Sequence, residues 1–387
     1  MITDGFTYVA LLLFVSSLIL VLEKSTDWAI FRLVPAVVFI YLVSMLLCTL
    51  DVWSMSATKP LYRELSAMLT YAMIFTMLLR CDIRKVFRLG PRMIFGFFSA
   101  TLTIAIGFAV AFLLMKPYLG DHAWMVLGAL SGSWIGGTDN LIEIQLALHI
   151  PEIEMGSAFI VDSINYSLWV MFLLWLITRA AGFNRWNKAS TKAIDAVSHE
   201  LEEDDAKRAG KISFQDIFLL LGTAFIVAAI GDSIGMLLYV ALPFFTKSIW
   251  TVLFIATMGL FAAFSPLSRV AGSLEIANVM LYLLIALVAS RSSFLEIGDA
   301  PLWILAGFII LAVHFLLMLL IARLFRLDMF TLCISSIANI GGTTSTPIVA
   351  SIYSGALIPV GILVSLIGHF IGTPLGIRIA RFLEMLV

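Results

Sequence analysis

The sequence predicts an all-α polytopic membrane protein, and three observations support this fold class. Hydrophobic residues make up 61% of the chain and charged residues only 13%, whereas about a quarter of the residues in soluble domains are charged. Long apolar segments recur along the whole length, and a helix needs about 20 such residues to cross a bilayer. The string Ile-Gly-Gly-Thr interrupts two of these segments, at residues 135–138 and 340–343. A β-barrel would instead show short alternating strands.

Charge and cysteine usage exclude several classes of protein. The net charge is −1 and no basic patch alternates with aromatic residues, so no nucleic-acid partner is expected. The three cysteines, Cys48, Cys81 and Cys333, lack C-x-x-C spacing and are interpreted as packing residues. The N-terminal segment has no basic region and no small-residue cleavage site, which favours a retained first span over a signal peptide.

Hydropathy predicts six spans before a polar linker and six after it. The first six are expected at residues 6–22, 29–49, 61–79, 90–115, 122–149 and 155–179. The last six are expected at residues 213–231, 248–266, 272–290, 301–323, 328–355 and 357–381. The charged linker between them is expected to be a solvated connector. This divides the chain into a first transmembrane repeat (1–182), a polar linker (183–212) and a second transmembrane repeat (213–387).

The charges of two matching loops indicate that the repeats have opposite orientations. The loop 80–92 carries five basic residues, which places it in the cytoplasm: Arg80, Arg84, Lys85, Arg88 and Arg92. The matching loop 291–300 carries Arg291 against Glu296 and Asp299, which favours the outside. Six spans per repeat would give both the same orientation. We therefore expect an odd total, 11 or 13, with Gly231–Thr246 as a short extra pass or a re-entrant segment.

The second break predicts an anion site in mid-membrane. Hydroxyl residues precede Pro347, and this pattern is typical of a helix start, so Pro347–Ser354 is expected to be a half-helix. Its free N–H groups form a positive end that no acidic side chain neutralises, which suits a carboxylate. The first break differs, because Asp139 and Asn140 begin its second half-helix and Asp139 is expected to act as both cap and cation ligand. The alternative is that the glycines only permit close helix packing.

Ionisable residues inside spans are costly and usually functional. Asp162 and Asn165 are three residues apart on one helix face, and this pair is the predicted site for a coupling Na⁺ or proton. The alternative for Asp162 is a structural hydrogen bond to a neighbouring helix. Glu143 is expected to be either a second acid at the site or a residue at the cytoplasmic mouth. Ser365, His369 and Thr373 form a polar stripe in the second half.

The sequence contains no nucleotide-binding P-loop and no Cys/His metal cluster, so any transport is expected to be secondary. An enzyme of another class, an intramembrane hydrolase, would need Ser133 as nucleophile and His369 as base. Nothing in the spacing of these two residues requires them to meet.

Both breaks and their surroundings resemble a known family. SGSWIGGTDNL (131–141), FIVDSIN (159–165) and ANIGGTTSTP (338–347) are similar to the YjcL-like membrane proteins, domain of unknown function 819. PLYREL (60–65) and LLRCDIRKVF (78–87) fit the same pattern. The resemblance covers essentially the whole chain. It implies kinship with the cation/proton antiporter and bile-acid/sodium symporter superfamily.

The resemblance further implies inverted repeats with crossing discontinuous helices, as in a sodium/proton antiporter-like fold with core and panel domains. Thr138–Asn140 and Thr343–Pro347 would form the crossing. Asp162 would hold the position of the ion-binding carboxylate, but Ser163 follows it where an adjacent acid pair would be needed for antiporter stoichiometry.

Together these observations predict a secondary active transporter, coupled to Na⁺ or H⁺, for a small organic solute such as a carboxylate, amino acid or small peptide. A cation/proton antiporter is the alternative within the same architecture. No cofactor is expected beyond the coupling ion. The expected partners are the solute and the lipid bilayer of a bacterial inner (plasma) membrane. A homodimer is a candidate assembly. The predicted solute-binding residues are Gly136, Gly137, Thr138, Asn140, Asn339, Gly341, Gly342, Thr343, Thr344 and Ser345. The predicted coupling-ion residues are Asp162, Asn165, Asp139, Glu143 and His369.

Overall fold

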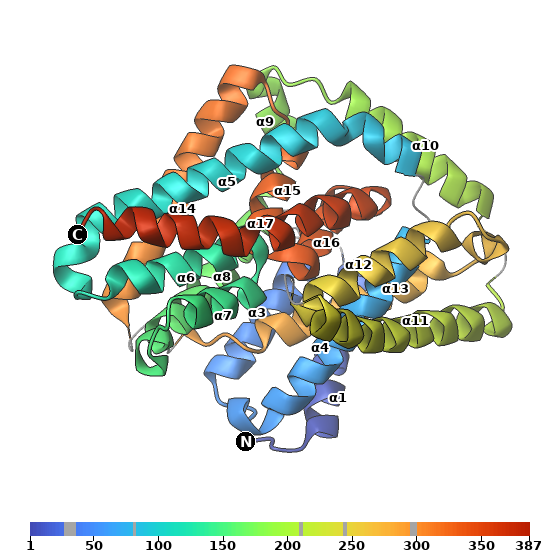
Figure 1. Cartoon of the computed structure of the whole chain (residues 1–387). Coiled ribbons are helices and arrows are strands. Elements are labelled where there is room, and N and C mark those ends of the chain that lie inside the picture. The colour runs from blue at the N-terminus through green and yellow to red at the C-terminus, as the bar shows by residue number, and fades with distance from the viewer. Residues whose placement is uncertain (27–35, 80–82, 209–211, 243–245, 295–299) are drawn as a thin grey trace. The chain divides into compact units, whose positions relative to one another are not determined.

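The computed structural model describes residues 1–26, 36–79, 83–208, 212–242, 246–294 and 300–387. Side chains are described in these ranges except at residues 83–89, 152–153 and 204–208. Within this part of the chain there are 16 α-helices, two short 3-10 helices and one isolated bridge between Ile2 and Trp53 (Figure 1). The all-α prediction is confirmed. Most of the basic loop 80–92 and the acidic residues of the loop 291–300 lie outside the described side chains.

Six of the described helices are long and apolar enough to cross a membrane, judged by length and composition. They are Gly5–Ser25, Gly90–Leu119, Glu154–Ile177, Phe214–Ala241, Pro301–Phe325 and Gly355–Glu384. Shorter apolar helices lie between them, and two of these belong to the interrupted segments. The chain is thus a multi-pass helical membrane protein, while the total of 11 or 13 crossings stays a prediction.

The chain folds into two compact units, and each takes segments from both halves of the sequence. The first unit contains residues 1–90, 192–291 and 354–360. Its helices are α1 (Gly5–Ser25), α3 (Ala36–Thr49), α4 (Met55–Leu78), α10 (Lys192–Arg208), α11 (Phe214–Ala241), α12 (Lys247–Ala262), η1 (Pro266–Arg269), α13 (Ser273–Ala289) and η3 (Gly355–Leu357). Helix α4 packs against α11, α12 and α13, and α13 packs against α1 and α3.

The second unit contains residues 91–191, 292–353 and 361–387. Its helices are most of α5 (Ile83–Leu119), α6 (Ala123–Gly136), α7 (Thr138–Ala147), α8 (Glu152–Ile177), α9 (Ala180–Asn187), α14 (Pro301–Phe325), α15 (Met329–Ile340), α16 (Gly342–Tyr353) and most of α17 (Ile358–Glu384). The same order, a long helix, an interrupted pair and a long helix, occurs twice, as α5–α8 and as α14–α17.

One detail of the predicted elements is wrong. Residues 231–241 are not a separate pass or re-entrant segment, because α11 continues without interruption to Ala241. No proline follows Gly231 within this stretch, so the helix can continue through it. The linker 183–212 is largely helical, because α9 and α10 occupy most of it.

Side-chain caps begin several of these helices. Asp4 accepts a hydrogen bond from the Thr7 N–H at the start of α1, and Ser213 forms a capping box with Asp216 at the start of α11. Asp328 begins α15 by accepting from the Thr331 N–H at 2.8 Å. Such caps satisfy N–H groups that a helix start leaves without partners.

Candidate functional site

Both Ile-Gly-Gly-Thr strings interrupt helices in the second unit. Helix α6 ends at Gly136 and α7 begins at Thr138, so that only Gly137 separates them. Gly137 has φ 109° and ψ 167°, a conformation that residues with a Cβ rarely adopt. Helix α15 ends at Ile340, and Gly342 at φ 57° begins α16. The prediction of two discontinuous helices is confirmed.

The two breaks lie against one another. A Cβ built on Gly342 would lie 3.8 Å from the carbonyl oxygen of Gly136. A Cβ on Gly368 of α17 would lie 2.4 Å from the Ile135 carbonyl oxygen and 3.2 Å from that of Ala338. Helix α17 therefore touches the last turns of both α6 and α15, and it does so with a glycine because a larger residue would collide with backbone.

Asp162 on α8 points at the first break. Its Oδ1 accepts hydrogen bonds from Ser133 Oγ at 2.9 Å and from Trp134 Nε1 at 3.0 Å. Its Oδ2 accepts a longer bond, 3.3 Å, from Thr138 Oγ1. The indole N–H can only donate, so this oxygen of Asp162 is held as an acceptor. Ser133 and Trp134 belong to the last turn of α6 and Thr138 to the first residue of α7, so the carboxylate joins the two half-helices.

The second break starts differently from the prediction. The half-helix α16 begins at Gly342, and Pro347 lies inside it. The positive φ of Gly342 makes the turn, so the chain is already helical when it reaches the proline. Pro347 has no N–H, and the carbonyl of Thr343, four residues earlier, therefore receives no helical hydrogen bond from it. Thr343 is buried and Thr344 half-buried in the first turn of α16.

Hydroxyl groups connect α16 to its neighbours. Ser345 is buried, and its Oγ is hydrogen-bonded to the hydroxyl of Tyr166 on α8. Thr346 Oγ1 donates to the carbonyl oxygen of Gly342 at 2.6 Å, inside the same helix. Helix α8 thus contacts the first break through Asp162 and the second through Tyr166, one turn further along.

His369 of α17 lies between the two breaks. Its Nε2 is 3.4 Å from Thr343 Oγ1 and 3.3 Å from the position of a Cβ on Gly342. The other side of the ring faces Gly137, whose Cβ position is 3.3 Å from Cε1 and 3.8 Å from Nδ1. His369 Nδ1 is buried and has no hydrogen-bond partner among the described residues. The sequence named His369 as a coupling-ion candidate within a polar stripe but did not locate it between the breaks. Ser365 of that stripe bonds back to Ile362 of its own helix.

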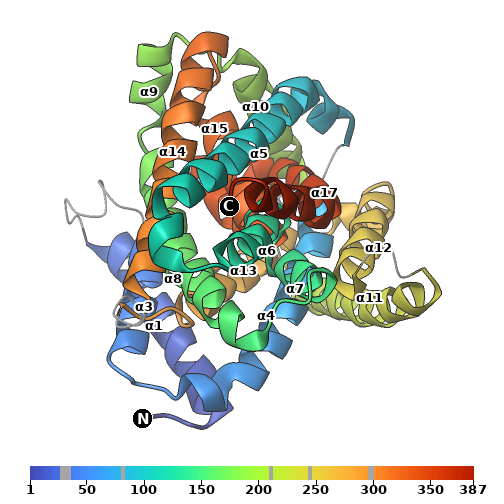
Figure 2. The ribbon, with the colours of Figure 1, turned by 60° about the vertical axis from the view of Figure 1, so that its left-hand side comes forward.

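Small residues let α6 and α17 approach closely, as the two helices lie side by side in Figures 1 and 2. A Cβ on Gly372 would lie 1.9 Å from Asn140 Nδ2 and 3.0 Å from the Cα of Gly136. A Cβ on Gly376 would lie 3.0 Å from the Cα of Gly132. Small residues recur every four positions on both helices, at 128, 132 and 136 and at 368, 372, 376 and 380. This spacing was present in the sequence and, as a small-x-x-x-small pattern, indicates a helix contact.

Asn140 is fully buried in this contact. Neither its Oδ1 nor its Nδ2 has a hydrogen-bond partner among the described residues. Asp139 beside it is half-buried in the first turn of α7. The prediction that Asp139 caps α7 is wrong, because the N-cap position belongs to Gly137 and no side chain caps it. Its charge still lies at the positive end of α7.

Two predicted site residues are engaged elsewhere. Asn165 is buried and donates through Nδ2 to the carbonyl oxygen of Ile304 on α14, at 3.1 Å. Asn339 accepts from Thr101 Oγ1 at 2.7 Å and donates to the carbonyl oxygens of Phe97 and Ser335. Asn165 therefore faces α14 instead of joining Asp162, and Asn339 fastens α15 to α5.

Glu143 lies one turn beyond Asp139 on α7. It is half-buried and accepts a hydrogen bond from Thr373 Oγ1 of α17. The structure thus places Glu143 on the face of α7 that meets α17, and not beside Asp162. Glu143 and Asp139 interact with each other as like charges.

A buried polar chain holds α15 in place. Trp169 Nε1 donates to Ser336 Oγ at 3.0 Å, and Ser336 Oγ lies 2.8 Å from His314 Nε2. His314 Nδ1 lies 2.7 Å from Thr103 Oγ1, which donates its own proton to the Ala100 carbonyl oxygen. His314 Nδ1 is therefore the donor in this chain and Nε2 the acceptor.

The pair that a hydrolase would need is engaged in other contacts. Ser133 Oγ donates to Asp162, while the Nε2 of His369 lies beside Thr343. The described residues also contain no group of three His, Cys, Asp or Glu side chains that could hold a metal ion. Cys48 and Cys333 are buried and form no disulfide, which agrees with a packing role.

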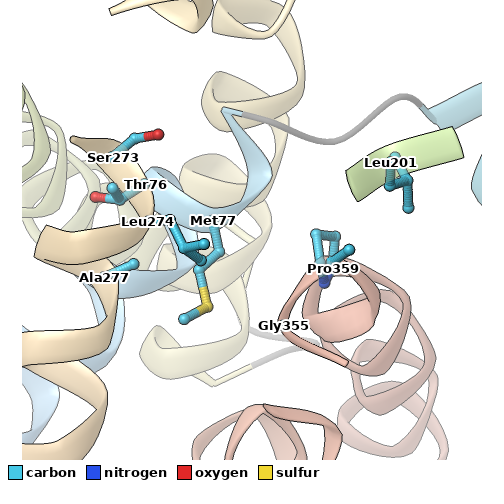
Figure 3. A pocket seen from close by; sticks show the side chains of 9 residues that line it. Thr76, Met77, Leu201, Ser273, Leu274, Ala277, Gly355 and Pro359 are labelled. Atoms are coloured by element: carbon cyan, nitrogen blue, oxygen red, sulfur yellow. The ribbon is translucent and has the colours of Figure 1, made fainter. Parts of the chain in front are cut away.

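A separate small cavity lies in the first unit (Figure 3). Its volume of about 20 Å³ has room for about one water molecule, far less than an organic solute needs. It is lined by Thr76, Met77, Leu201, Ser273, Leu274, Ala277, Gly355, Ala356 and Pro359. We therefore take the paired breaks, and not this cavity, as the candidate functional site.

A protein-family model described as "Protein of unknown function (DUF819)" matches residues 10–386, which include both breaks and Asp162. The chain belongs to the DUF819 family. A relative in Bacillus subtilis (strain 168), "Uncharacterized membrane protein YjcL", is 26% identical over 347 residues, which cover 84% of this chain and 85% of the relative. The resemblance seen in the break motifs is thereby confirmed at the level of the family. It agrees with the multi-pass membrane character of this DUF819 protein.

Proposed function

We propose that this DUF819 protein is a secondary active transporter that couples the movement of a small organic solute to a cation. The observation that carries the proposal is the meeting of two interrupted helices in one unit, with the Asp162 carboxylate held at the first break and His369 between both. Paired interrupted helices in matching halves are the arrangement from which many secondary transporters build their central site. Backbone freed by a break must be buried in protein or line a water-filled cavity.

The two breaks offer ends of different charge to a solute. The first turn of α16 has hydroxyl groups and no acidic residue, so its free N–H groups favour a carboxylate. The first turn of α7 carries Asp139, which favours a cationic group. Solutes with a carboxylate, alone or together with an ammonium group, fit this pair of ends. The proposed substrates are therefore carboxylates, amino acids or small peptides.

Asp162 is the proposed cation-binding carboxylate. It accepts three hydrogen bonds, and in the part of the chain that the structure describes no cationic side chain pairs with it. A half-buried carboxylate with only neutral donors gains from an added cation. Asn165 is not included in this proposal, because its side chain lies against α14, where Nδ2 donates to the Ile304 carbonyl oxygen.

The helix order of α5–α8 recurs in α14–α17, which supports inverted repeats. The break motifs also imply kinship with the cation/proton antiporter and bile-acid symporter superfamily, and this kinship supports inverted repeats as well. In this proposal the second unit is the moving core, the first unit is the panel, and the membrane is a bacterial inner membrane. A homodimer is the candidate assembly.

The test uses purified protein in proteoliposomes, with labelled carboxylates, amino acids and dipeptides offered under an inward Na⁺ gradient or an inward pH gradient. We expect one solute class to accumulate under one gradient. Asp162→Asn should abolish the accumulation, whereas the matched control Ser365→Ala, at a hydroxyl that bonds only within α17, should retain it. A thermal-shift screen narrows the candidates beforehand, since a ligand at a hundredfold excess over its Kd stabilises the fold by about 2.7 kcal/mol.

Three results would contradict the proposal. Cation exchange for protons with no solute present would favour an antiporter. Loss of a hydrolytic activity in Ser133→Ala with transport absent would favour a hydrolase. No movement of any solute or cation, in vesicles whose protein is folded, would remove transport altogether.

A further inference from the structure

The ring of His369 has one nitrogen on the side of each break. Nε2 lies beside Thr343 Oγ1 and Gly342 at the start of α16, whereas Nδ1 lies on the side of Gly137 at the start of α7. Gly137 and Gly342 both have positive φ, a conformation that residues with a side chain rarely adopt. The His369 ring can therefore lie directly against the backbone at both positions. Within the described part of the chain Nδ1 is buried without a hydrogen-bond partner, which is costly for a ring nitrogen unless another state of the site supplies one.

Three side chains continue from this ring along the contact between α7 and α17. On α7, Asp139 and Glu143 are four residues apart, and on α17 His369 and Thr373 have the same spacing, so each pair lies on one face of its helix. Thr373 Oγ1 donates to Glu143, and the charge of Asp139 acts on both Glu143 and the His369 ring. Among the described side chains, neither acid forms an ion pair with Lys or Arg.

We propose that His369 is a proton-binding site and that Glu143 and Asp139 form the path by which a proton reaches it, with the Thr373 hydroxyl holding the Glu143 carboxyl against α17. The inference rests on the proposed function in one respect: it names the proton as a coupling ion. The proton comes from water at the far end of α7 and passes from the Glu143 carboxyl to the Asp139 carboxylate and then to His369 Nδ1. Each transfer breaks one bond to hydrogen and forms one, and no other reactant is needed.

Protonation of His369 changes what the ring offers to the two breaks. In the neutral ring one nitrogen donates and the other accepts, whereas in the charged ring both donate. The charged ring then donates from Nε2 to Thr343 and from Nδ1 towards the first break, where Asp139 stabilises the positive charge. The groups facing His369 are Asp139 from α7 and the uncharged Thr343 from α16. The proton therefore links the starts of α7 and α16, the two elements proposed to hold the solute.

The first experiment follows the histidine rings by NMR in protein labelled with ¹⁵N-histidine and held in lipid nanodiscs. The chain has only five histidines, so the signal lost in His369→Gln identifies this ring, and His369→Asn is the second variant should the first not fold. We expect the His369 signal to change between about pH 5 and 8, where histidine usually gains its proton. Asp139→Asn should lower its proton affinity by about tenfold, since a nearby opposite charge favours the charged form.

Matched variants separate the path from the site. Glu143→Gln should slow proton exchange at His369 without removing the titration, and Ser365→Ala should change neither. The signals of the other histidines report whether each variant is folded. The proposal is overturned when the wild-type His369 signal is constant over this pH range, or when Asp139→Asn leaves the titration unchanged.

The second experiment distinguishes failure of this inference from failure of transport. In proteoliposomes with an inward pH gradient, His369→Gln should lose at least about tenfold of the gradient-driven accumulation that the wild type shows. When solute accumulates equally in wild type and His369→Gln, the proton path is wrong although transport stands. When no solute moves under any gradient, the transport proposal fails, and the NMR titration still decides the proton site.

Discussion

Replacing Gly368 by alanine should test directly whether α17 contacts the ends of both interrupted helices. A Cβ at residue 368 would lie 2.4 Å from the Ile135 carbonyl oxygen and 3.2 Å from the Ala338 carbonyl oxygen. Both atoms are backbone atoms of half-helices, so neither can rotate away as a side chain would. Inserting a methyl group into packed structure costs about 1–3 kcal/mol, and we expect the upper end of this range.

The gain in helix propensity offsets part of this cost. Alanine is favoured over glycine by about 1 kcal/mol in a helix interior. The net destabilisation of Gly368→Ala should therefore be about 2 kcal/mol, which is roughly a thirtyfold fall in the ratio of folded to unfolded protein, since 1.36 kcal/mol is about tenfold. Equilibrium unfolding in mixed lipid–detergent micelles, followed by circular dichroism, measures it.

Gly156 of α8 is the matched control. It also lies inside a helix, but a Cβ there would meet nothing within 4 Å. Gly156→Ala should consequently be neutral or more stable than wild type by up to about 1 kcal/mol. If the two alanine variants prove equally stable, α17 does not approach the ends of α6 and α15 as described, and the reasoning about the paired breaks fails with it.

Three further predictions concern acidic residues. Asp162→Asn removes the charge of a carboxylate that accepts hydrogen bonds from Ser133 and Trp134, and hydrogen bonds to charged groups contribute about 1.5–3 kcal/mol each. Both the melting temperature and the ion-driven uptake of the variant should therefore fall. An unchanged melting temperature would show that these hydrogen bonds are absent. Asp328→Ala removes the cap of α15 and should cost about 1–2 kcal/mol in the same unfolding assay, unlike Asp328→Asn, which keeps an acceptor and should cost less. The Thr7 N–H and hydroxyl hold the pKa of Asp4 below its ordinary value of 3.8, so this cap stabilises the start of α1 above that pH and is lost as the pH falls through the lowered pKa. Hydrogen exchange of the Thr7 amide, compared between wild type and Asp4→Asn, should show that loss in wild type alone.

Several features of this protein could be read from the order of its residues. Membrane class follows from composition, because apolar helices of sufficient length have few other environments. Both interruptions were predictable, since two adjacent glycines followed by hydroxyl or acidic residues cannot continue an apolar helix without leaving polar groups in lipid. That Asp162 has hydrogen-bond partners was predictable as well, because a carboxylate inside a span needs them, while its role in binding a cation stays a prediction.

Other features depend on helices that are distant in the sequence. Whether Asn165 joins Asp162 or turns to α14 depends on which neighbour packs on each side of α8, and a spacing of three residues does not specify this. The hydrogen-bond partners of Asn339, next to the second break, cannot be inferred from the sequence either. Only the packing of α5 against α15 shows that the oxygen and the nitrogen of its amide both form hydrogen bonds with α5. The start of α16 was misplaced because Pro347 is a stronger local signal than the positive φ of Gly342, which is visible only in the folded backbone.

The sequence by itself determined that this chain is a multi-pass helical membrane protein with two interrupted helices and an acid beside one of them. Only the tertiary structure decided that His369 lies between the interruptions and that α17 brings them together through its glycines. The physical reason is that hydropathy and backbone breaks are local properties of a segment. The partners of a buried polar side chain are instead set by which helices pack against it.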